Sequence, residues 1–393
     1  MLAGAVLPYP QHPSGGYAMP RIIDVQIYAM EQHRPDYSWS PVMPHVLNTD
    51  TIVRITDENG MIGVGSVCTF TEYGVDRAVL ESIRPLAMNL LQQDNPSPQA
   101  FWHEMKMRRP GVSNMAMGAI DGALWDLAAR QHDLPLYQYL GGTNQGRSRL
   151  PAYASVPILD NPDAYIALID QLRGSGFSIF KFHYQSVAEP DIALINAVSD
   201  AHGHDCQFMF DAENLYDEES ARKVADVMAD RGYIWLEAPF NDHDWASYRR
   251  LKDHARLPII AAGNSVVDPA HLAQAIAADC WDAIRIDAAT AGGITPSLEV
   301  FAQARNANLK VELQSWGSAI STSANLHLAF AHHNSSYVEI PVPRGDFTVP
   351  GTAQFDLTSD GYVMAPTAPG IGLELDWAVI ETSAAAHAEH GRR

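Results

Sequence analysis

The sequence predicts an α/β fold in which a TIM-type barrel of parallel strands follows a smaller α+β domain. Two patterns lead to this prediction. In the first third of the chain, strand-like runs precede helical segments, whereas beyond residue 140 short β-rich runs alternate with amphipathic segments. A polar residue also stands at the end of almost every β-rich run in the second region. The 393 residues are enough for a large barrel and one further domain.

The first region is interpreted as a capping domain over residues 21–140, after a flexible N-terminal extension at 1–20. RIIDVQIYAM, at 21–30, alternates as a half-buried strand does. TIVRITDENGMIGVGSV, at 51–67, holds two β-rich runs around an ENG turn, which predicts a hairpin. The helical segments expected next are 74–91, 98–107 and 115–131, and small residues in the last of these predict close packing.

The second region is interpreted as a barrel over residues 141–360. Amphipathic segments such as 188–203 and 219–232 separate the β-rich runs, and this alternation favours βα units around a parallel sheet. Eight such runs predict a (β/α)8-type barrel with a modified pairing of the last strand. We expect residues 361–393 to return to the capping domain. The runs are AYASVP, FSIFKFH, QFMFD, YIWLE, LPIIAAG, WDAIRID, LKVELQS and SYVEIPV.

Polar side chains at the ends of seven runs recur every 23 to 30 residues, about one βα unit apart. In such barrels the C-terminal ends of the strands carry the chemistry. A single residue of this kind is more often structural, but the periodic series predicts an active site. Its members are Lys181, Asp211, Glu237, Asn264, Asp287, Gln314 and Glu339.

Composition excludes several classes of partner. The 26 basic and 46 acidic residues give a formal net charge of −20, which argues against nucleic acid and anionic membranes. No apolar run approaches the ~20 residues of a membrane span, and the N-terminus lacks the pattern of a signal peptide. The three cysteines form neither a disulfide framework nor a zinc pattern. We therefore expect a cytoplasmic protein.

Lys181 and His183 lie two residues apart in 179-IFKFHYQS-186, so an extended chain projects both to one side. A histidine here is as often a satisfied core residue as a functional one. A lysine on the inward face of a strand needs a partner or a purpose. The pair therefore predicts proton transfer at the barrel mouth.

Asp211, Glu237 and Asn264 follow three consecutive strands, and their oxygen donors would converge at the mouth. Hard oxygen ligands without cysteine or histidine suit Mg²⁺, with Mn²⁺ as a second candidate. The alternative is that each residue caps the next helix, but Glu is a poor cap and Ala-Pro follows Glu237. Beside such a cation, Lys181 or His183 would remove a proton next to a substrate carboxylate.

The motifs K-x-[KH], D-A-x, L-E-x-P, A-A-G-x-S, D…A-G-G-I-T and x-S-W-G-S, in this order, resemble the enolase superfamily, and its mandelate-racemase-like branch most. The resemblance covers about residues 21–380. It implies a modified (β/α)7β TIM barrel with an N-terminal α+β capping domain, a Mg²⁺ site and α-proton abstraction from a small carboxylate substrate. It also suggests an even-numbered homo-oligomer.

Four departures from the family pattern bear on the reaction. The second lysine of K-x-K is His183, the third acidic ligand is Asn264, and the Asn of D-A-N is Glu213. The histidine of P-H-x-W-G is replaced by Gln314, although its usual partner is present as Asp287. Because Gln314 cannot ionise, no proton donor is expected on the face opposite Lys181 and His183.

One-sided proton chemistry favours syn elimination of water from a sugar acid or another hydroxy acid. Cycloisomerisation or lactone opening comes next, and racemisation or epimerisation third. A barrel that binds a ligand without turnover is the remaining alternative, although such a protein would have no use for Lys181.

Specificity is expected from capping-domain loops at 31–45 and 67–74, which carry aromatic residues and Arg34. Solvated loops are the alternative for both segments. The residues expected to bind or support the substrate are Arg34, Glu213, Asp287, Gln314, Trp316 and Glu339.

Overall fold

A computed structural model describes residues 19–34, 38–43, 46–71, 74–94, 96–108, 111–141, 147–343 and 356–391. The side chains of residues 32–34 and 46 also lie outside the description. The flexible extension predicted at 1–20 therefore falls almost entirely on residues of which nothing is described.

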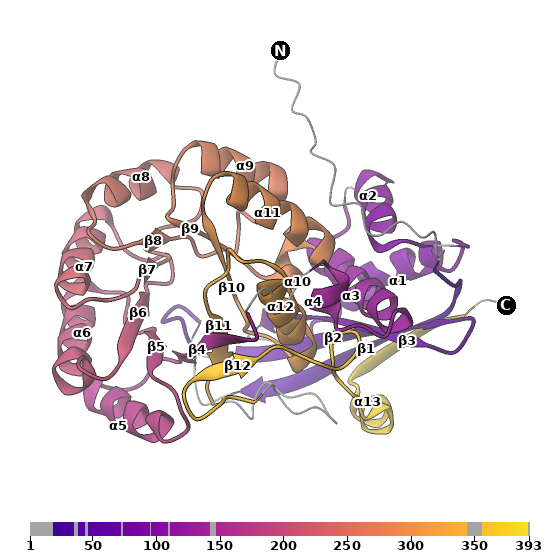
Figure 1. The fold of residues 1–393 in the computed structure, drawn as a ribbon, viewed down its shortest axis with the longest axis horizontal. Coiled ribbons are helices and arrows are strands. Elements are labelled where there is room, and N and C mark those ends of the chain that lie inside the picture. Colours follow the sequence, from indigo (N-terminus) through magenta and orange to yellow (C-terminus); the bar gives the residue numbers. More distant parts are fainter. Residues whose placement is uncertain are drawn as a thin grey trace, which may run out of the picture.

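The capping region contains a four-stranded antiparallel sheet in the order β13-β1-β2-β3 (Figure 1). The hairpin predicted around the ENG turn is confirmed, because Thr56 pairs with Ile62 and Gly60 between them has a φ of +83°. The edge strand β13 comes from the end of the chain. The strands are β1 (Ile22–Arg34), β2 (Val46–Asp57), β3 (Ile62–Thr71) and β13 (Ala386–Gly391).

Helix α3 lies against β3 as closely as its small residues predict. A Cβ atom at Gly65 would come within 2.1 Å of the carbonyl oxygen of Ala119, so only glycine fits there. Ser113 caps the helix by accepting a hydrogen bond from the backbone N–H of Ala116. The helices of this region are α1 (Ala78–Leu90), α2 (Pro98–Arg108), α3 (Asn114–Gln131) and α4 (Leu136–Tyr139).

All eight β-rich runs of the second region form parallel strands, in the ladder order β10-β9-β8-β7-β6-β5-β4-β11. Helices follow each of the first seven, which confirms the (β/α)7β barrel (Figure 1). The strands are β4 (Arg149–Val156), β5 (Ile179–Phe182), β6 (Gln207–Asp211), β7 (Leu236–Glu237), β8 (Ile259–Ile260), β9 (Ala283–Ile286), β10 (Lys310–Leu313) and β11 (Val338–Pro341).

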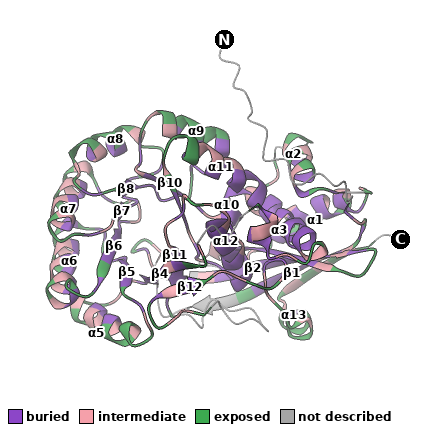
Figure 2. Ribbon diagram, in the orientation of Figure 1, coloured by how far each residue is buried: buried purple, intermediate pink, exposed green. Residues whose placement is uncertain are grey.

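The barrel helices α5 to α9 bury one face and expose the other, whereas α12 is buried almost throughout (Figure 2). In α7 the buried residues Ala221, Val224, Ala225 and Met228 recur at helical spacing. The helices are α5 (Pro162–Arg173), α6 (Ala188–His202), α7 (Glu218–Asp230), α8 (Trp245–His254), α9 (Pro269–Ala277), α10 (Ala288–Ala291), α11 (Ile294–Asn306) and α12 (Ala319–Ala331). In the described part of the chain, no helix is long and apolar enough to cross a membrane.

The last part of the chain contacts both regions. Strand β12 (Tyr362–Met364) pairs antiparallel with β4 of the barrel. After α13 (Trp377–Ser383), β13 pairs with β1 of the capping sheet. The chain thus ties the barrel to the capping sheet after the last barrel strand.

A buried polar contact fixes the capping helices to the barrel beside the strand ends. Asp121 of α3 accepts hydrogen bonds from Thr295, at 2.8 Å from its backbone N–H and 2.6 Å from its hydroxyl. Trp125 of α3 donates to the same hydroxyl at 3.0 Å. Gly293 has a φ of +126°, and a Cβ there would collide with Asp121. The AGGIT segment therefore docks the cap onto the barrel.

Candidate active site

A cavity of about 600 Å³ lies over the strand ends, between the barrel and the cap. Barrel residues line its floor, and Trp39, Phe70 and Met115 line it from the capping region. Most of the residues predicted for the site contribute to its wall. They are Lys181, His183, Asp211, Glu213, Glu237, Asn264, Asp287, Gln314 and Trp316.

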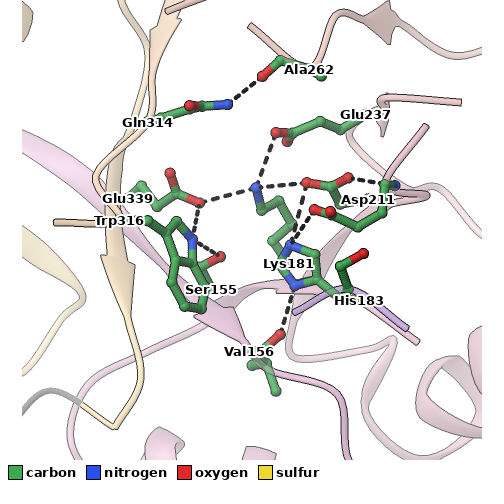
Figure 3. Close-up of polar contacts among 12 residues, drawn as sticks. Ser155, Val156, Lys181, His183, Asp211, Glu237, Ala262, Gln314, Trp316 and Glu339 are labelled. Atoms are coloured by element: carbon green, nitrogen blue, oxygen red, sulfur yellow. Dashed lines mark hydrogen bonds and ion pairs between the residues drawn. The ribbon is translucent and has the colours of Figure 1, made fainter. Parts of the chain in front are cut away.

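Lys181 lies at the centre of the floor, with three carboxylates around its ammonium group (Figure 3). Its Nζ is 3.2 Å from Asp211, 3.1 Å from Glu237 and 3.0 Å from Glu339. Burial works to lower the pKa of this lysine, but Glu237 and Glu339 outweigh burial and hold that pKa well above its ordinary value. The surrounding carboxylates therefore favour the protonated form of Lys181 in this arrangement.

Arg285 of β9 is a second buried cation on the floor, and it was not among the predicted site residues. Its Nε donates to Glu237 at 2.8 Å, and its Nη2 donates to Glu339 at 2.9 Å. Burial alone would raise the pKa of Glu339, but Arg285 and Lys181 lower it to about 2. Two cations and two carboxylates thus form a closed ionic network inside the barrel.

His183 follows β5 and is 2% exposed. Its Nδ1 lies 2.8 Å from the carbonyl oxygen of Val156, and since a carbonyl only accepts, Nδ1 carries a hydrogen. Its Nε2 lies 3.3 Å from Asp211 and 3.9 Å from Glu213. Burial lowers the pKa of this imidazole, but the hydrogen bond and the charge of Asp211 outweigh burial. The pKa of His183 is therefore raised above its ordinary value. Nε2 is thus the ring nitrogen that faces the carboxylates of the cavity.

Asp211 and Glu213 have opposite pKa shifts. Burial alone would raise the pKa of Asp211, but Lys181 and His183 lower it below its ordinary value. Burial and the charge of Asp211 raise the pKa of Glu213 to about 8. Glu213 also has a φ of +53°, an uncommon conformation for a residue with a side chain. Negative charge is therefore in excess on this side of the floor.

Asn264 lies after β8, and its loop is held by Asp242. The two carboxylate oxygens of Asp242 accept backbone hydrogen bonds from Ala262, Asn264 and Ser265 at 2.9 to 3.0 Å. Gln314 donates its side-chain amide to the carbonyl oxygen of Ala262 and, at 3.3 Å, to Oδ1 of Asn264. Gln314 therefore orients the loop that carries Asn264.

Asp287 caps α10 and accepts a hydrogen bond from Asn325 at 2.8 Å. Burial raises its pKa to about 6. Trp316 donates its indole N–H to Ser155 at 3.1 Å and to Glu339 at 3.3 Å. Glu339 lies below the cavity, where it pairs with both cations. Arg34 ends β1, and its side chain lies outside the described residues.

The donor set fits a divalent cation. Asp211, Glu213, Glu237 and Asp287 offer four carboxyl groups at the floor and Glu339 a fifth below it, whereas Lys181 and Arg285 are the basic side chains among the described lining residues. Burial raises the pKa of Glu213 most, and the charge of Asp211 raises it further. Among the described residues, ligand atoms of His183, Asp211 and Glu213 lie within 4.8 Å of one another. The sequence instead favours Asp211, Glu237 and Asn264, and Asp211 belongs to both sets.

Among the described lining residues, His183 is the only histidine. Gln314 occupies the position at which related sequences were expected to carry a second histidine. Its side chain donates a hydrogen bond to Asn264, and Asp287 accepts one from Asn325. The arrangement can move protons from the side of Lys181 and His183.

Family models match both parts of the chain. The model described as enolase C-terminal domain-like matches residues 164–379, and the N-terminal domain model of mandelate racemase/muconate lactonizing enzyme matches 41–141. A structure from Pseudovibrio sp., described as a mandelate racemase/muconate lactonizing enzyme, is 32% identical with a TM-score of 0.88, and the match covers 95% of this chain and 99% of that one.

Two curated relatives have named activities. D-galactonate dehydratase of Klebsiella pneumoniae (strain 342) is 27% identical over 82% of this chain and 88% of that protein. D-galactarolactone cycloisomerase of Agrobacterium fabrum is 24% identical over 91% and 97%. L-talarate dehydratase from Polaromonas sp. JS666, solved with Mg and L-glucarate, has the same fold, with 23% identity, a TM-score of 0.78, and coverage of 95% and 99%. The chain belongs to the mandelate racemase/muconate lactonizing enzyme group of the enolase superfamily.

Proposed function

We propose that this protein is a Mg²⁺-dependent hydro-lyase that removes the α-proton of a sugar acid or a related hydroxy acid and eliminates water. The observation that carries the proposal is the placement of Lys181 and His183 on one side of a carboxylate-lined cavity. The dehydratase names of its relatives support the same class of reaction.

His183 is the proton carrier in this proposal. Its Nδ1–H is committed to Val156, so neutral His183 presents its lone pair at Nε2. Lys181, whose ammonium group lies between three carboxylates, is the second candidate for the base. If His183 carries the proton, the charge of Lys181 stabilises negative charge that develops on the substrate carboxylate.

The proposed elimination balances with a single acid/base. The α-C–H bond breaks and its proton moves to Nε2 of His183. The β-C–O bond then breaks, and the leaving hydroxide takes a proton from His183 to become water. The resulting enol tautomerises to a 2-keto-3-deoxy acid. A bound divalent cation supplies positive charge that makes a proton beside a carboxylate easier to remove.

We propose Asp211, Glu237 and Asn264 as the residues that hold the cation, because this set leaves His183 free for proton transfer. Glu213 and Gln314 then border the substrate, together with Trp316. Mn²⁺ as a substitute for Mg²⁺, the role of Arg34 and an even-numbered homo-oligomer remain predictions.

Cycloisomerisation is the second candidate, since one acid/base on one face also serves that reaction, and the Agrobacterium relative is a cycloisomerase. Incubation of aldonic acids and their lactones with the protein and Mg²⁺ distinguishes the two. A 2-keto-3-deoxy acid that forms with Mg²⁺ and not with chelator supports dehydration. An isomeric acid from a lactone supports the second candidate, and no product from any acid contradicts both.

A further inference from the structure

Three aromatic side chains form a wall on one side of the cavity. The ring centroids of Trp39 and Trp316 are 4.6 Å apart, and those of Trp39 and Phe70 are 4.9 Å apart. Trp316 is fixed by its hydrogen bonds to Ser155 and Glu339. All three residues line the cavity and are partly exposed. We call Trp39, Phe70 and Trp316 the aromatic wall.

The basic side chains among the described lining residues lie on the floor of the cavity. They are Lys181 and Arg285, and both are 1% exposed and paired with carboxylates. The lining residues from the capping region are the aromatic, apolar and small polar side chains around Trp39 and Phe70, with one charged group, Asp76. The described residues at this end of the cavity therefore offer a substrate an apolar surface and a negative charge.

These two features assign a class of substrate. We infer that the substrate is a monocarboxylate whose end away from the reacting carboxylate is uncharged and places a C–H face against the aromatic wall. An aldonate or an anhydro or lactone ring meets this description. The second carboxylate of an aldarate would lose water beside Asp76 without gaining a described cation, which is costly. The inference rests on the proposed function, because that function places the reacting carboxylate at the floor.

Matched acids test the inference. Calorimetry in Mg²⁺ measures the dissociation constants of D-galactonate and galactarate, and of D-gluconate and D-glucarate, which differ at the distal carbon. We expect each aldonate to bind at least about tenfold more tightly than its aldarate, a difference of about 1.4 kcal/mol. Equal or tighter binding of the aldarates would overturn the assignment. The titrations use the His183→Asn variant, which the proposed function makes inactive, so that the acids bind without being consumed. Binding by this variant is measured independently of turnover, so this result is separate from the failure of the proposed function.

Val42 provides a variant with a matched control. It lines the cavity from the capping region and is 69% exposed, so a longer side chain there has room. Val42→Lys adds a cation at the uncharged end and should improve aldarate binding relative to aldonate binding by several-fold. Val42→Met adds similar length without charge and should leave the ratio unchanged. If both variants behave alike, charge at this end does not set the preference and the inference is wrong.

Discussion

His183 and Val156 are joined by a hydrogen bond of 2.8 Å from the imidazole Nδ1 to the backbone carbonyl oxygen. The contact links the end of β5 to the end of β4 and leaves Nε2 towards the carboxylates of the cavity. The ring is thus held in one tautomer when it is neutral, which is the condition that a general base must meet.

Replacing His183 by Asn keeps a side-chain N–H for Val156 but removes the group that carries a proton. The predicted loss in kcat is about 10²- to 10⁴-fold, with the dissociation constant for Mg²⁺ within a few-fold of wild type. Steady-state kinetics and metal titration measure the two quantities. Near-normal turnover would exclude His183 as the proton carrier.

Lys181→Met should destabilise the barrel, because three buried carboxylates lose the cation between them. The expected loss is about 3–5 kcal/mol in urea unfolding, and Mg²⁺ should recover part of it. The same substitution at Lys223, an exposed residue of α7 paired only with Glu219 in the described contacts, serves as the control and should cost nothing measurable. A variant at position 181 as stable as wild type would show that the network does not need this lysine.

The two candidate metal sets predict different effects of two isosteric changes. If Asp211, Glu237 and Asn264 hold the cation, Glu237→Gln should weaken Mg²⁺ binding by at least about tenfold, and Glu213→Gln should change it little. The opposite pattern in calorimetric titration would assign the ion to the neighbourhood of His183, Asp211 and Glu213.

The contact between Asp121 and Thr295 predicts a dependence of stability on pH. Burial raises the pKa of Asp121 to about 7, although its hydrogen bonds to Thr295 lower it. Since the folded state holds this proton more tightly than the unfolded state, the contribution is complete below about pH 4 and is lost as pH rises through 7. Its size is about 4 kcal/mol.

Asp121→Asn should therefore remove a decline in stability between about pH 4 and 7 that wild type shows. Thermal unfolding across this range, with the exposed Asp163→Asn of α5 as control, measures the difference. Parallel curves for wild type and the Asp121 variant would refute the assigned titration.

Much of the barrel was predictable because strands and helices leave local patterns. The eight strands and the strand-end residues follow from periodicity, even where a ladder is as short as Leu236–Glu237. Arg285 was not predicted as a site residue, because it lies inside the strand-like run WDAIRID and not at its end. Its spacing of two from Asp287 was the available signal, since both then face the same side.

Contacts across the barrel were not predictable. Lys181 of β5 contacts Glu339 of β11 because both strands pair with β4, although they lie far apart in the chain. The sequence offered Lys181 and His183 as equal candidates for the base, and the carboxylates around Lys181 come from strands far from it in the chain. The aromatic wall likewise joins segments near residues 39, 70 and 316, whose proximity depends on how the cap sits on the barrel.

In the proposed reaction, protons move on one face of the substrate only. The most direct measurement is nuclear magnetic resonance of an aldonate substrate during turnover with Mg²⁺ in deuterated water. We predict a 2-keto-3-deoxy acid as product, while the remaining substrate keeps its configuration at the α-carbon. An α-epimer with deuterium at the inverted centre would contradict the claim, because a second proton donor would then act on the opposite face.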